Sequence, residues 1–427
     1  MTFSGPSQAN DRAVELRGAG RLPEAIAALR DGIALFPNVI ELHQNLAHML
    51  YEFGELPAAI VEHRAVLALE ENNVASRLGL YELLQIAGER DEALVHQRAA
   101  LRTLRLFSQI APHQQRSILC LCAPGDWQAN IPVDFLFDHD TTTVHKLYLV
   151  DENDMDAQVP VRYDVVWNTI AESPEALPYL ALANRFMHAH HNKPTLNSPA
   201  RVITTGRSLL DSTLSGTNAR VAPVVVVEQE RLRNAALPLA FPLIARPLGS
   251  HAGQGLERLT DRDACGPYVE RNPSQRYFVS PFIDYASTDG YFRKYRVVYV
   301  DGVPYPVHLA ISPNWMIHYY NAPMREHEWM RKEEAAFLQD PRLAFDGPRF
   351  ETLVKIGAAV GLEYFGIDCG IDRDGNVLVF EADAAMLVHT SDPIDLYPYK
   401  HEFVPRIYRA VEQMIDRRKA VAPAADT

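Results

Sequence analysis

Cysteine is scarce in this chain of 427 residues, which has only Cys120, Cys122, Cys265 and Cys369. So few scattered thiols do not build a disulfide scaffold, and no pair has a second pair at zinc-site spacing. Long apolar runs are also missing, because none reaches the roughly 18 residues of a membrane span. The start, MTFSGPSQANDRA, lacks the basic segment and apolar core of a signal peptide. These absences predict a soluble, cytoplasmic protein without a membrane partner.

An excess of basic charge is missing as well. Lys and Arg number 41 against 54 Asp and Glu, which gives a formal net charge of −13. Proteins that coat nucleic acid normally carry the opposite sign, so no nucleic-acid partner is expected. The composition is otherwise globular, with 47% apolar and 22% charged residues. At this length, two or three domains are expected.

An internal repeat of 34 residues runs through the first hundred positions. Gly20, Gly54 and Gly88 keep this spacing, and three more columns are in register: Leu16, Leu50 and Leu84; Ala25, Ala59 and Ala93; Ile26, Ile60 and Leu94. The columns predict three helix pairs over residues 1–108, with each glycine in the turn between two helices. The period resembles the tetratricopeptide repeat, although the tryptophan of its consensus is absent. That resemblance implies binding of a peptide or partner protein; a purely structural or dimerising role is the alternative.

The pattern of apolar and polar residues changes after the repeats. SILCLCAP, KLYLV and YDVVWNT read as short buried strands that alternate with a helical stretch at 174–191. From about residue 221 the strands become hairpin-like, with helices expected at 326–338 and 347–360. We therefore predict a multidomain chain: the all-α repeats, an α/β domain at 116–220, and an α+β domain at 221–418. The histidines at 188, 190 and 191 are expected at a helix end rather than around a metal.

One hairpin, at residues 363–383, gathers acidic residues. Asp374-Gly375 is a strong two-residue turn signal. With that turn, Asp368 lies opposite Glu381, and Asp383 follows on the same face. The other face is then expected to be apolar, made of Phe365, Ile367, Cys369 and Ile371 against Leu378 and Phe380.

Carboxylates that face each other on a sheet destabilise it by up to roughly 1 kcal/mol per pair, so something must offset their charge. A hard divalent cation such as Mg²⁺ is the simplest candidate. The alternative is a solvated outer face, for which mixed charges are expected. However, no Lys or Arg occurs between positions 374 and 399.

Two further segments suggest anion binding. RPLGSHAGQG, from Arg246 to Gly255, can bring backbone N–H groups onto phosphate oxygens, although an ordinary hairpin loop is the alternative. Arg293, Lys294 and Arg296 precede a second turn signal at Asp301-Gly302. Lys294 and Arg296 share a strand face and can reach one anion, although a solvated basic face is the commoner explanation for such a cluster.

Taken in this order, the segments resemble the ATP-grasp superfamily over residues 116–415. The carrying segments are YDVVWNTIAE…NKPTLNSPARVITTGRSLL, PLIARPLGSHAGQG, YFVSPFIDY, KYRVVYVDG and FGIDCG…VFEAD. The resemblance implies that ATP and one or two Mg²⁺ ions are bound. The implied metal ligands are Asp368, Glu381 and Asp383.

The resemblance also assigns the nucleotide and catalytic residues. Phosphate contacts fall to Arg207 and Arg246, under a cover formed by Gly249, Ser250, His251, Gly253 and Gly255. Phe282 and Ile283 line the adenine slot, and Asp284 lies near the ribose. Arg296, with Lys294 and Arg246, stabilises charge that develops in the reaction, and Arg293 and His308 contact substrate.

Five positions depart from the family pattern. Arg207 and Arg246 stand where lysine is usual, which keeps the charge and adds a bidentate fork. Asp383 replaces an asparagine, Pro281 stands where many members have glutamate, and Lys294 stands where an acidic residue is common.

The implied activity is ATP-dependent carboxylate–amine ligation through an acyl phosphate, with a peptide or natural product recruited by the repeats. A small-molecule carboxylate or amine is the second partner. Two alternatives are a catalytically impaired ATP-binding scaffold, and a small-molecule kinase or synthetase whose repeats serve oligomerisation.

Overall fold

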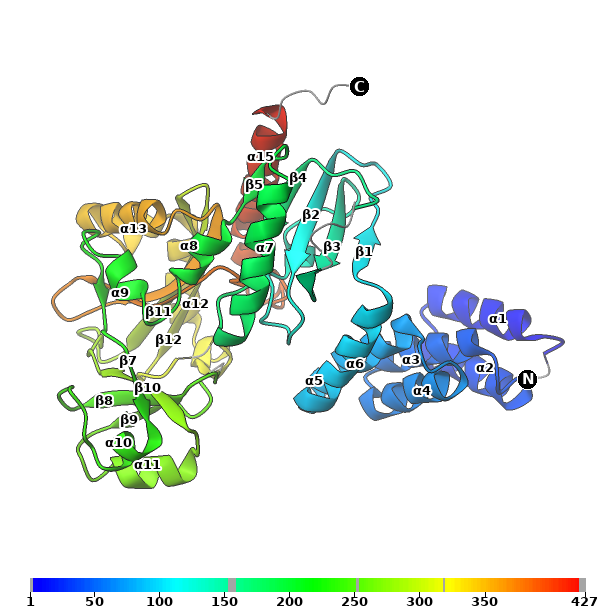
Figure 1. The fold of residues 1–427 in the computed structure, drawn as a ribbon, viewed down its shortest axis with the longest axis horizontal. Coiled ribbons are helices and arrows are strands. Elements are labelled where there is room, and N and C mark those ends of the chain that lie inside the picture. The colour runs from blue at the N-terminus through cyan, green and yellow to red at the C-terminus, as the bar shows by residue number, and fades with distance from the viewer. Residues whose placement is uncertain (1–2, 153–158, 251–252, 318, 422–427) are drawn as a thin grey trace. The chain divides into compact units, whose positions relative to one another are not determined.

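The computed structural model describes residues 3–152, 159–250, 253–317 and 319–421. The chain divides into two compact units (Figure 1). One comprises Met1–Phe107, Pro124–Trp127 and Lys146–Val150, and the other comprises Ser108–Ala123, Gln128–His145 and Asp151–Thr427. Among the described residues, no helix is both long and apolar enough to cross a membrane.

The first unit consists mainly of paired helices: α1 (Pro6–Gly18), α2 (Leu22–Leu35), α3 (Ile40–Phe53), α4 (Leu56–Leu69), α5 (Val74–Ile86) and α6 (Arg90–Thr103). Gly20, Gly54 and Gly88 lie between the helices of successive pairs, with φ angles of 74°, 90° and 85°. This backbone region strongly favours glycine. The predicted helix pairs and their glycine turns are confirmed; membership of the repeat family and a peptide-binding role stay predictions.

The alanine column explains how closely these helices approach. Ala25, Ala59 and Ala93 are completely buried, and they belong to one continuous apolar cluster that runs through the helix pairs. Because a methyl group is the whole side chain, the backbones can approach without leaving a void. The 34-residue spacing therefore reports a packing requirement that recurs in each pair.

The first sheet has the strand order β1-β3-β2-β4-β5. Its strands are β1 (Leu106–Gln109), β2 (Arg116–Cys122), β3 (Thr142–Tyr148), β4 (Val165–Asn168) and β5 (Thr195–Leu196). β2 and β4 are parallel, as are β4 and β5, and α7 (Leu177–Ala189) connects the latter two. The predicted α/β texture is confirmed. His188, His190 and His191 cluster at the end of α7, where each Nδ1 contacts a backbone carbonyl oxygen.

The second sheet is antiparallel, with the order β7-β10-β8-β9. It consists of β7 (Val225–Glu228), β8 (Leu243–Pro247), β9 (Glu257–Leu259) and β10 (Arg276–Pro281), and α10 (Gln229–Arg233) and α11 (Cys265–Arg271) pack on it (Figure 1). The glycine-rich segment links β8 to β9, which pair with each other, so it is a hairpin loop. Arg246 on β8 lies opposite Phe278 on β10, which leads into the segment Phe282–Asp284.

The third sheet carries the acidic hairpin and has the order β12-β11-β13-β14-β6. Its strands are β6 (Arg220–Val221), β11 (Phe292–Val300), β12 (Val303–Ser312), β13 (Tyr364–Ile371) and β14 (Val377–Asp383). Asp301 and Gly302 form the predicted two-residue turn, with φ angles of 50° and 76°.

Aromatic packing covers one face of the third sheet. Tyr295 lies 5.0 Å from Phe337 and 4.8 Å from Phe345, measured between ring centroids, and Tyr299 stacks on Phe365 at 4.4 Å. Phe337 belongs to α12 (Glu328–Gln339), and α13 (Gly347–Val360) follows it. Both predicted helices are confirmed. The other α-helices in the described residues are α8 (Pro199–Ile203), α9 (Leu210–Thr213), α14 (Pro398–Phe403) and α15 (Pro405–Val421).

The turn of the acidic hairpin differs from the expectation. Asp372 pairs with Asn376, which leaves Arg373, Asp374 and Gly375 as a three-residue loop with Gly375 at φ 84°. Three-residue hairpin loops commonly place glycine at this position. A bulge between Asp368 and the following residue then shifts the register by one, so Asp368 lies opposite Glu381 after all. The predicted pair is confirmed, and the predicted two-residue turn is wrong.

The same bulge corrects the expected apolar face. Leu378 and Phe380 do not lie with Phe365 on the helix-covered side; they belong to a cluster with Tyr285 and Ala310. A Cβ built on Gly370 would come within 3.0 Å of Phe380 and 3.1 Å of Tyr285. Leu378 lies on the carboxylate face because the three-residue loop pairs it with Gly370, and Phe380 is the extra residue of the bulge, which lets it turn to the same face.

Candidate functional site

The site is built around a buried charge cluster on β11 and β13. Asp368 is 2% exposed, and Arg296 lies directly opposite it on β11. Arg296 donates to both carboxylate oxygens, from Nε at 2.8 Å and from Nη2 at 3.0 Å, and Lys294 donates from Nζ at 2.9 Å. Burial by itself raises the pKa of Asp368, but the charges of Arg296 and Lys294 outweigh it and hold that pKa well below its ordinary value.

A second pair brings in the loop between α8 and α9. Arg207 donates from Nη2 to the Glu381 carboxylate at 2.6 Å. Arg246 on β8 interacts electrostatically with both groups. Its pKa is lowered to about 10, mainly by burial and also by the charge of Arg207, while the charge of Glu381 opposes that change. Two guanidinium groups from different segments therefore converge beside Glu381.

Asp383 completes the acidic face. Its pKa is raised to about 6, mainly by burial and also by the charge of Glu381, although the backbone N–H of Ala385 donates to it at 2.8 Å and lowers the pKa. A carboxylate with a raised pKa gains more than an ordinary one from a nearby cation. Asp383 is thus the least compensated of the three predicted acidic residues.

The structure changes the reason for expecting a metal ion. Among the described residues, no three His, Cys, Asp or Glu side chains are gathered as a metal-binding group. Asp368 and Glu381 are instead neutralised by Lys294, Arg296 and Arg207, which come from other parts of the chain. The offset that the facing carboxylates require is therefore supplied in this structure by side chains of the chain itself, and a metal ion stays a prediction. The donor chemistry, three carboxylates on one sheet face, still suits a hard cation.

The glycine-rich loop is tied to Arg246. The Arg246 guanidinium donates from Nε to the Ser250 hydroxyl at 3.2 Å, and it also contacts the Ser250 carbonyl oxygen. Gly249, Gly253 and Gly255 have φ angles of 78°, 73° and 65°, the region in which glycine is least strained. His251 lies outside the described residues.

The predicted adenine segment follows β10. The Phe282 ring has the Arg258 guanidinium 4.0 Å from its centre, and the Trp315 ring lies 5.6 Å away. Ile283 packs against the apolar cluster that contains Leu378 and Phe380. The Asp284 carboxylate pairs with Arg373 at 2.8 Å. This segment therefore borders the same sheet face as the charge cluster.

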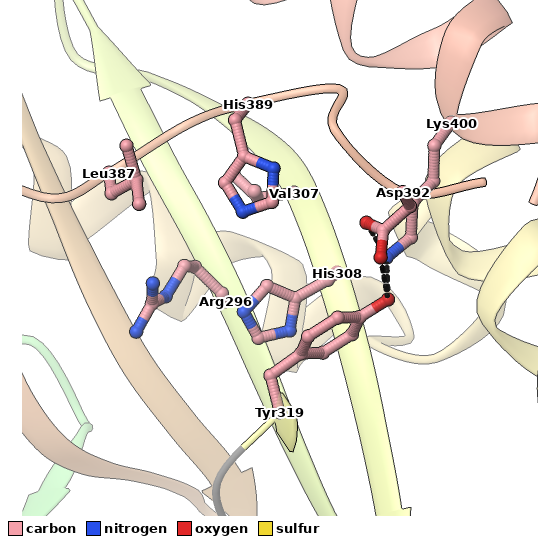
Figure 2. A pocket seen from close by; sticks show the side chains of 8 residues that line it. All are labelled: Arg296, Val307, His308, Tyr319, Leu387, His389, Asp392 and Lys400. Carbon is pink, nitrogen blue, oxygen red and sulfur yellow. Dashed lines mark hydrogen bonds and ion pairs between the residues drawn. The ribbon is translucent and has the colours of Figure 1, made fainter. Parts of the chain in front are cut away.

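Two predicted substrate residues separate in the structure. Arg293 is held by Glu333 at 2.5 Å and by Asp289 at 2.9 Å, away from Asp368. His308 lies opposite Arg296 on β12 and lines a cavity of about 90 Å³ that Arg296 also lines (Figure 2). His308 belongs with the site, and Arg293 does not.

The sequence patterns do not predict several residues that lie at the site. Tyr319, Leu387, His389, Asp392 and Lys400 line the cavity. They are dispersed over 82 positions without a spacing rule, although His389 and Asp392 closely follow the acidic strand.

Glu172 is a further such residue. Burial raises the pKa of its carboxyl and the charge of Arg207 opposes the rise. It lies in the YDVVWNTIAE segment, where the sequence offered only a family likeness.

Neither a protein-family model nor a curated protein matches this sequence. Among solved structures, the chain is similar to the D-alanine–D-alanine ligase from Bacillus anthracis complexed with ATP, with a TM-score of 0.44 and 10% identity over 71% of this chain and 99% of that one. For the VanG D-Ala:D-Ser ligase from Enterococcus faecalis the values are 0.44 and 11%, over 71% and 99%. For a RimK domain ATP-grasp protein from Sphaerobacter thermophilus they are 0.41 and 13%, over 70% and 99%.

Proposed function

We propose that the second unit binds Mg·ATP and joins a carboxylate to an amine through an acyl phosphate. One observation carries the proposal: cationic side chains from three separate segments converge on an acidic sheet face. Arg207 comes from a loop, Arg246 from the second sheet and Arg296 from the third. An apolar segment, Phe282–Ile283, borders the same face and offers a place for a base. Convergent cations beside carboxylates are what phosphoryl transfer requires.

Arg207 and Arg246 are the proposed phosphate ligands. In the present state Arg207 is occupied by Glu381, and Arg246 is occupied by Ser250. A phosphate group offers three charged oxygens, so it competes well for both guanidinium forks. Phosphate binding then releases the Glu381 carboxylate.

Glu381 and Asp383, with Asp368, are the proposed ligands of Mg²⁺. Bound there, the ion supplies charge neutralisation of the phosphate oxygens. Of the three carboxylates, Asp383 would be stabilised most by the bound ion, because its raised pKa shows that its negative charge is not compensated by neighbouring cations.

Arg296 is the proposed stabiliser of the acyl phosphate. Its guanidinium is held in place by two hydrogen bonds to Asp368, and Lys294 holds the other side of that carboxylate. A donor that is oriented before reaction costs no reorganisation when charge develops on the substrate.

The direct test is release of ADP and phosphate from Mg·ATP in the presence of candidate carboxylates and amines, with the amide product identified by mass spectrometry. Release that depends on the carboxylate supports the ligase. Arg207→Ala should abolish it, and Arg342→Ala, which alters an arginine 65% exposed at the surface, should not. Equal activity in both variants would contradict the proposed site.

A binding scaffold remains a second candidate, because the chain neutralises Asp368 and Glu381 with its own cations. Tight ATP binding without turnover, for every carboxylate and amine tried, would favour the scaffold.

We also propose that the helical unit recruits a peptide or protein partner. Deleting residues 1–105 is a poor test, because Tyr81 and Gln97 hydrogen-bond Gly125 within the same unit. Hydrogen exchange of the intact chain is better. Added peptide substrate should protect amides in α1–α6, and a small-molecule amine should not.

A further inference from the structure

The Asp368 carboxylate has most of its hydrogen-bonding capacity taken by the chain itself. A carboxylate offers about four lone pairs, two on each oxygen. Oδ2 accepts from Arg296 Nη2 at 3.0 Å and from Lys294 Nζ at 2.9 Å, which occupies both of its lone pairs. Oδ1 accepts from Arg296 Nε at 2.8 Å and, among the described residues, keeps one lone pair. Asp368 can therefore contact one metal ion through Oδ1, and it cannot be shared between two.

The strand geometry holds Lys294 beside this carboxylate. Lys294 is two residues before Arg296 on β11, so both side chains project from one face of the sheet. Tyr295, between them, packs against the aromatic side chains on the opposite face. Across from Lys294 on β12 lies Ala310, which is completely buried and leaves room for the lysine stem. The Lys294 side chain is only 14% exposed, so its charge belongs to the site rather than to the surface.

The Lys294 ammonium group keeps donors for a ligand. It has three N–H groups, and one of them donates to Asp368. In the part of the chain that the structure describes, Lys294 makes no other hydrogen bond or ion pair. Unmade hydrogen bonds of a buried charged group are unfavourable unless water or a ligand satisfies them. Phosphate oxygens, which are charged and have several lone pairs, suit the two remaining donors.

The charges at the site leave little need for two divalent ions. Three carboxylates meet four cationic side chains, which are Arg207, Arg246, Lys294 and Arg296. Two divalent ions would add four positive charges to a face where cations already outnumber anions, and like charges repel strongly in a partly buried site. A single ion adds only two, which the phosphate oxygens of a nucleotide can offset.

We propose that the Lys294 ammonium group takes the place of one divalent cation. It bridges Asp368 to a phosphate oxygen of the bound nucleotide, and the site takes a single divalent ion, at Glu381 and Asp383, to which Asp368 can add one oxygen. The inference rests on the proposed binding of Mg·ATP and reduces the expected one or two ions to one.

The test counts divalent ions bound to the full-length protein. Mn²⁺ is titrated into protein saturated with a non-hydrolysable ATP analogue, and electron paramagnetic resonance measures the free ion. The original protein should bind one Mn²⁺ per bound nucleotide. Lys294→Glu should bind two, because a carboxylate replaces the competing cation and supplies a ligand beside Asp368. The second ion should also broaden the spectrum through magnetic coupling between the two ions.

Two further variants test the bridge to phosphate, and they decide the matter if Lys294→Glu does not fold. Lys294→Met keeps the stem without the charge, so the analogue should bind roughly tenfold more weakly. Lys294→Arg keeps the charge and should recover most of the affinity. Lys332→Met is the matched control, because that lysine is 74% exposed on α12, and it should bind like the original protein. Thermal unfolding of each variant verifies that it is folded.

Two Mn²⁺ ions per nucleotide in the original protein overturn the proposal, and so does a single ion in a folded Lys294→Glu protein. A folded Lys294→Met protein that binds the analogue as tightly as the original also overturns it, since Lys294 is then only a structural partner of Asp368.

These outcomes separate from those for the ligase. One Mn²⁺ per nucleotide without carboxylate-dependent ADP release refutes the ligase and keeps the assignment of Lys294. Two ions together with carboxylate-dependent ADP release do the reverse. If the analogue does not bind at all, both the proposed function and the role of Lys294 are contradicted.

Discussion

Replacing Asp368 with asparagine should destabilise the second unit strongly. The change leaves Lys294 and Arg296 facing a neutral amide, at a position where the carboxylate was 2% exposed. Removing one partner of a buried ion pair typically costs about 3–5 kcal/mol. Arg296 also interacts with the charges of Glu381 and Asp383, which softens the loss. We therefore expect a cost near the lower end, about 3 kcal/mol.

Glu381→Gln is the matched comparison, since it also converts a carboxylate of the site to its amide. In its ion pair with Arg207, the arginine side chain is 28% exposed and the Glu381 side chain is 33% exposed. Partly exposed pairs contribute little, so we expect a loss of about 1 kcal/mol or less. Adding Lys294→Met to the Asp368→Asn protein should recover part of its loss, because one unpaired buried cation is then removed.

Urea unfolding followed by tryptophan fluorescence measures these differences. Trp167, Trp315 and Trp329 belong to the second unit and only Trp127 to the first, so the signal reports mainly on the unit that is altered. A loss in Asp368→Asn below about 1 kcal/mol, or one equal to that of Glu381→Gln, would refute the assignment of Asp368 as the buried counter-ion.

The same variant predicts a change in pH dependence. The pKa of Asp368 is depressed in the folded protein, so its contribution is fully present above the unfolded pKa, near 4, and is lost as the pH falls further. Each pH unit below that value costs about 1.4 kcal/mol until the folded pKa is reached. Asp368→Asn should remove this loss. If the free energy of unfolding of the variant fell with pH below 4 as steeply as that of the original protein, the prediction would be contradicted.

Three other changes test different parts of the structure. Gly357→Ala should destabilise α13 by roughly 2 kcal/mol or more, because its Cβ would lie 2.6 Å from a carbonyl oxygen of the β11–β12 turn; Gly347→Ala, with nothing within 4 Å, should be near neutral in thermal unfolding. Burial lowers the pKa of His63 to about 4, so the helical unit should lose stability as the pH falls from 6.5 toward 4, by up to roughly 3 kcal/mol; circular dichroism of His63→Gln should show a weaker dependence. Arg207→Ala should weaken ATP binding roughly tenfold yet strengthen Mn²⁺ binding in the absence of nucleotide, because it frees the Glu381 carboxylate. If electron paramagnetic resonance showed the same Mn²⁺ affinity in both proteins, the proposal that phosphate displaces Glu381 from Arg207 would be contradicted.

Local patterns predicted the elements well, since each depends on residues close together in the chain. The Asp301-Gly302 turn follows from two residues that accept positive φ. The acidic hairpin shows the limit of the same reasoning. An identical Asp-Gly signal at 374–375 lies in a three-residue loop, and only the bulge beside Asp368 restores the pairing with Glu381. Turn length and bulge depend on packing of the whole sheet, which the dipeptide does not encode.

The charge balance of the site shows the limit more clearly. Positions 374–399 contain no Lys or Arg, which favours a metal ion as the counter-charge. The structure supplies Lys294 and Arg296 from a neighbouring strand, and Arg207 from a loop 174 positions before Glu381. Which ions meet is decided by strand order, and strand order is set by the burial of apolar faces rather than by the charges themselves.

Residue spacing and turn chemistry predict the helix pairs, the hairpin strands and the residue types of the acidic face, because both act within a few residues. In contrast, Arg293 turns away, His308 enters the site, and Leu378 and Phe380 join the acidic face only once the sheet has assembled. The cavity likewise forms only in the folded chain, because two of its lining residues, Arg296 and Asp392, are 96 positions apart. A side chain's surroundings depend on the register and packing of elements that are distant in the chain, which no local pattern encodes.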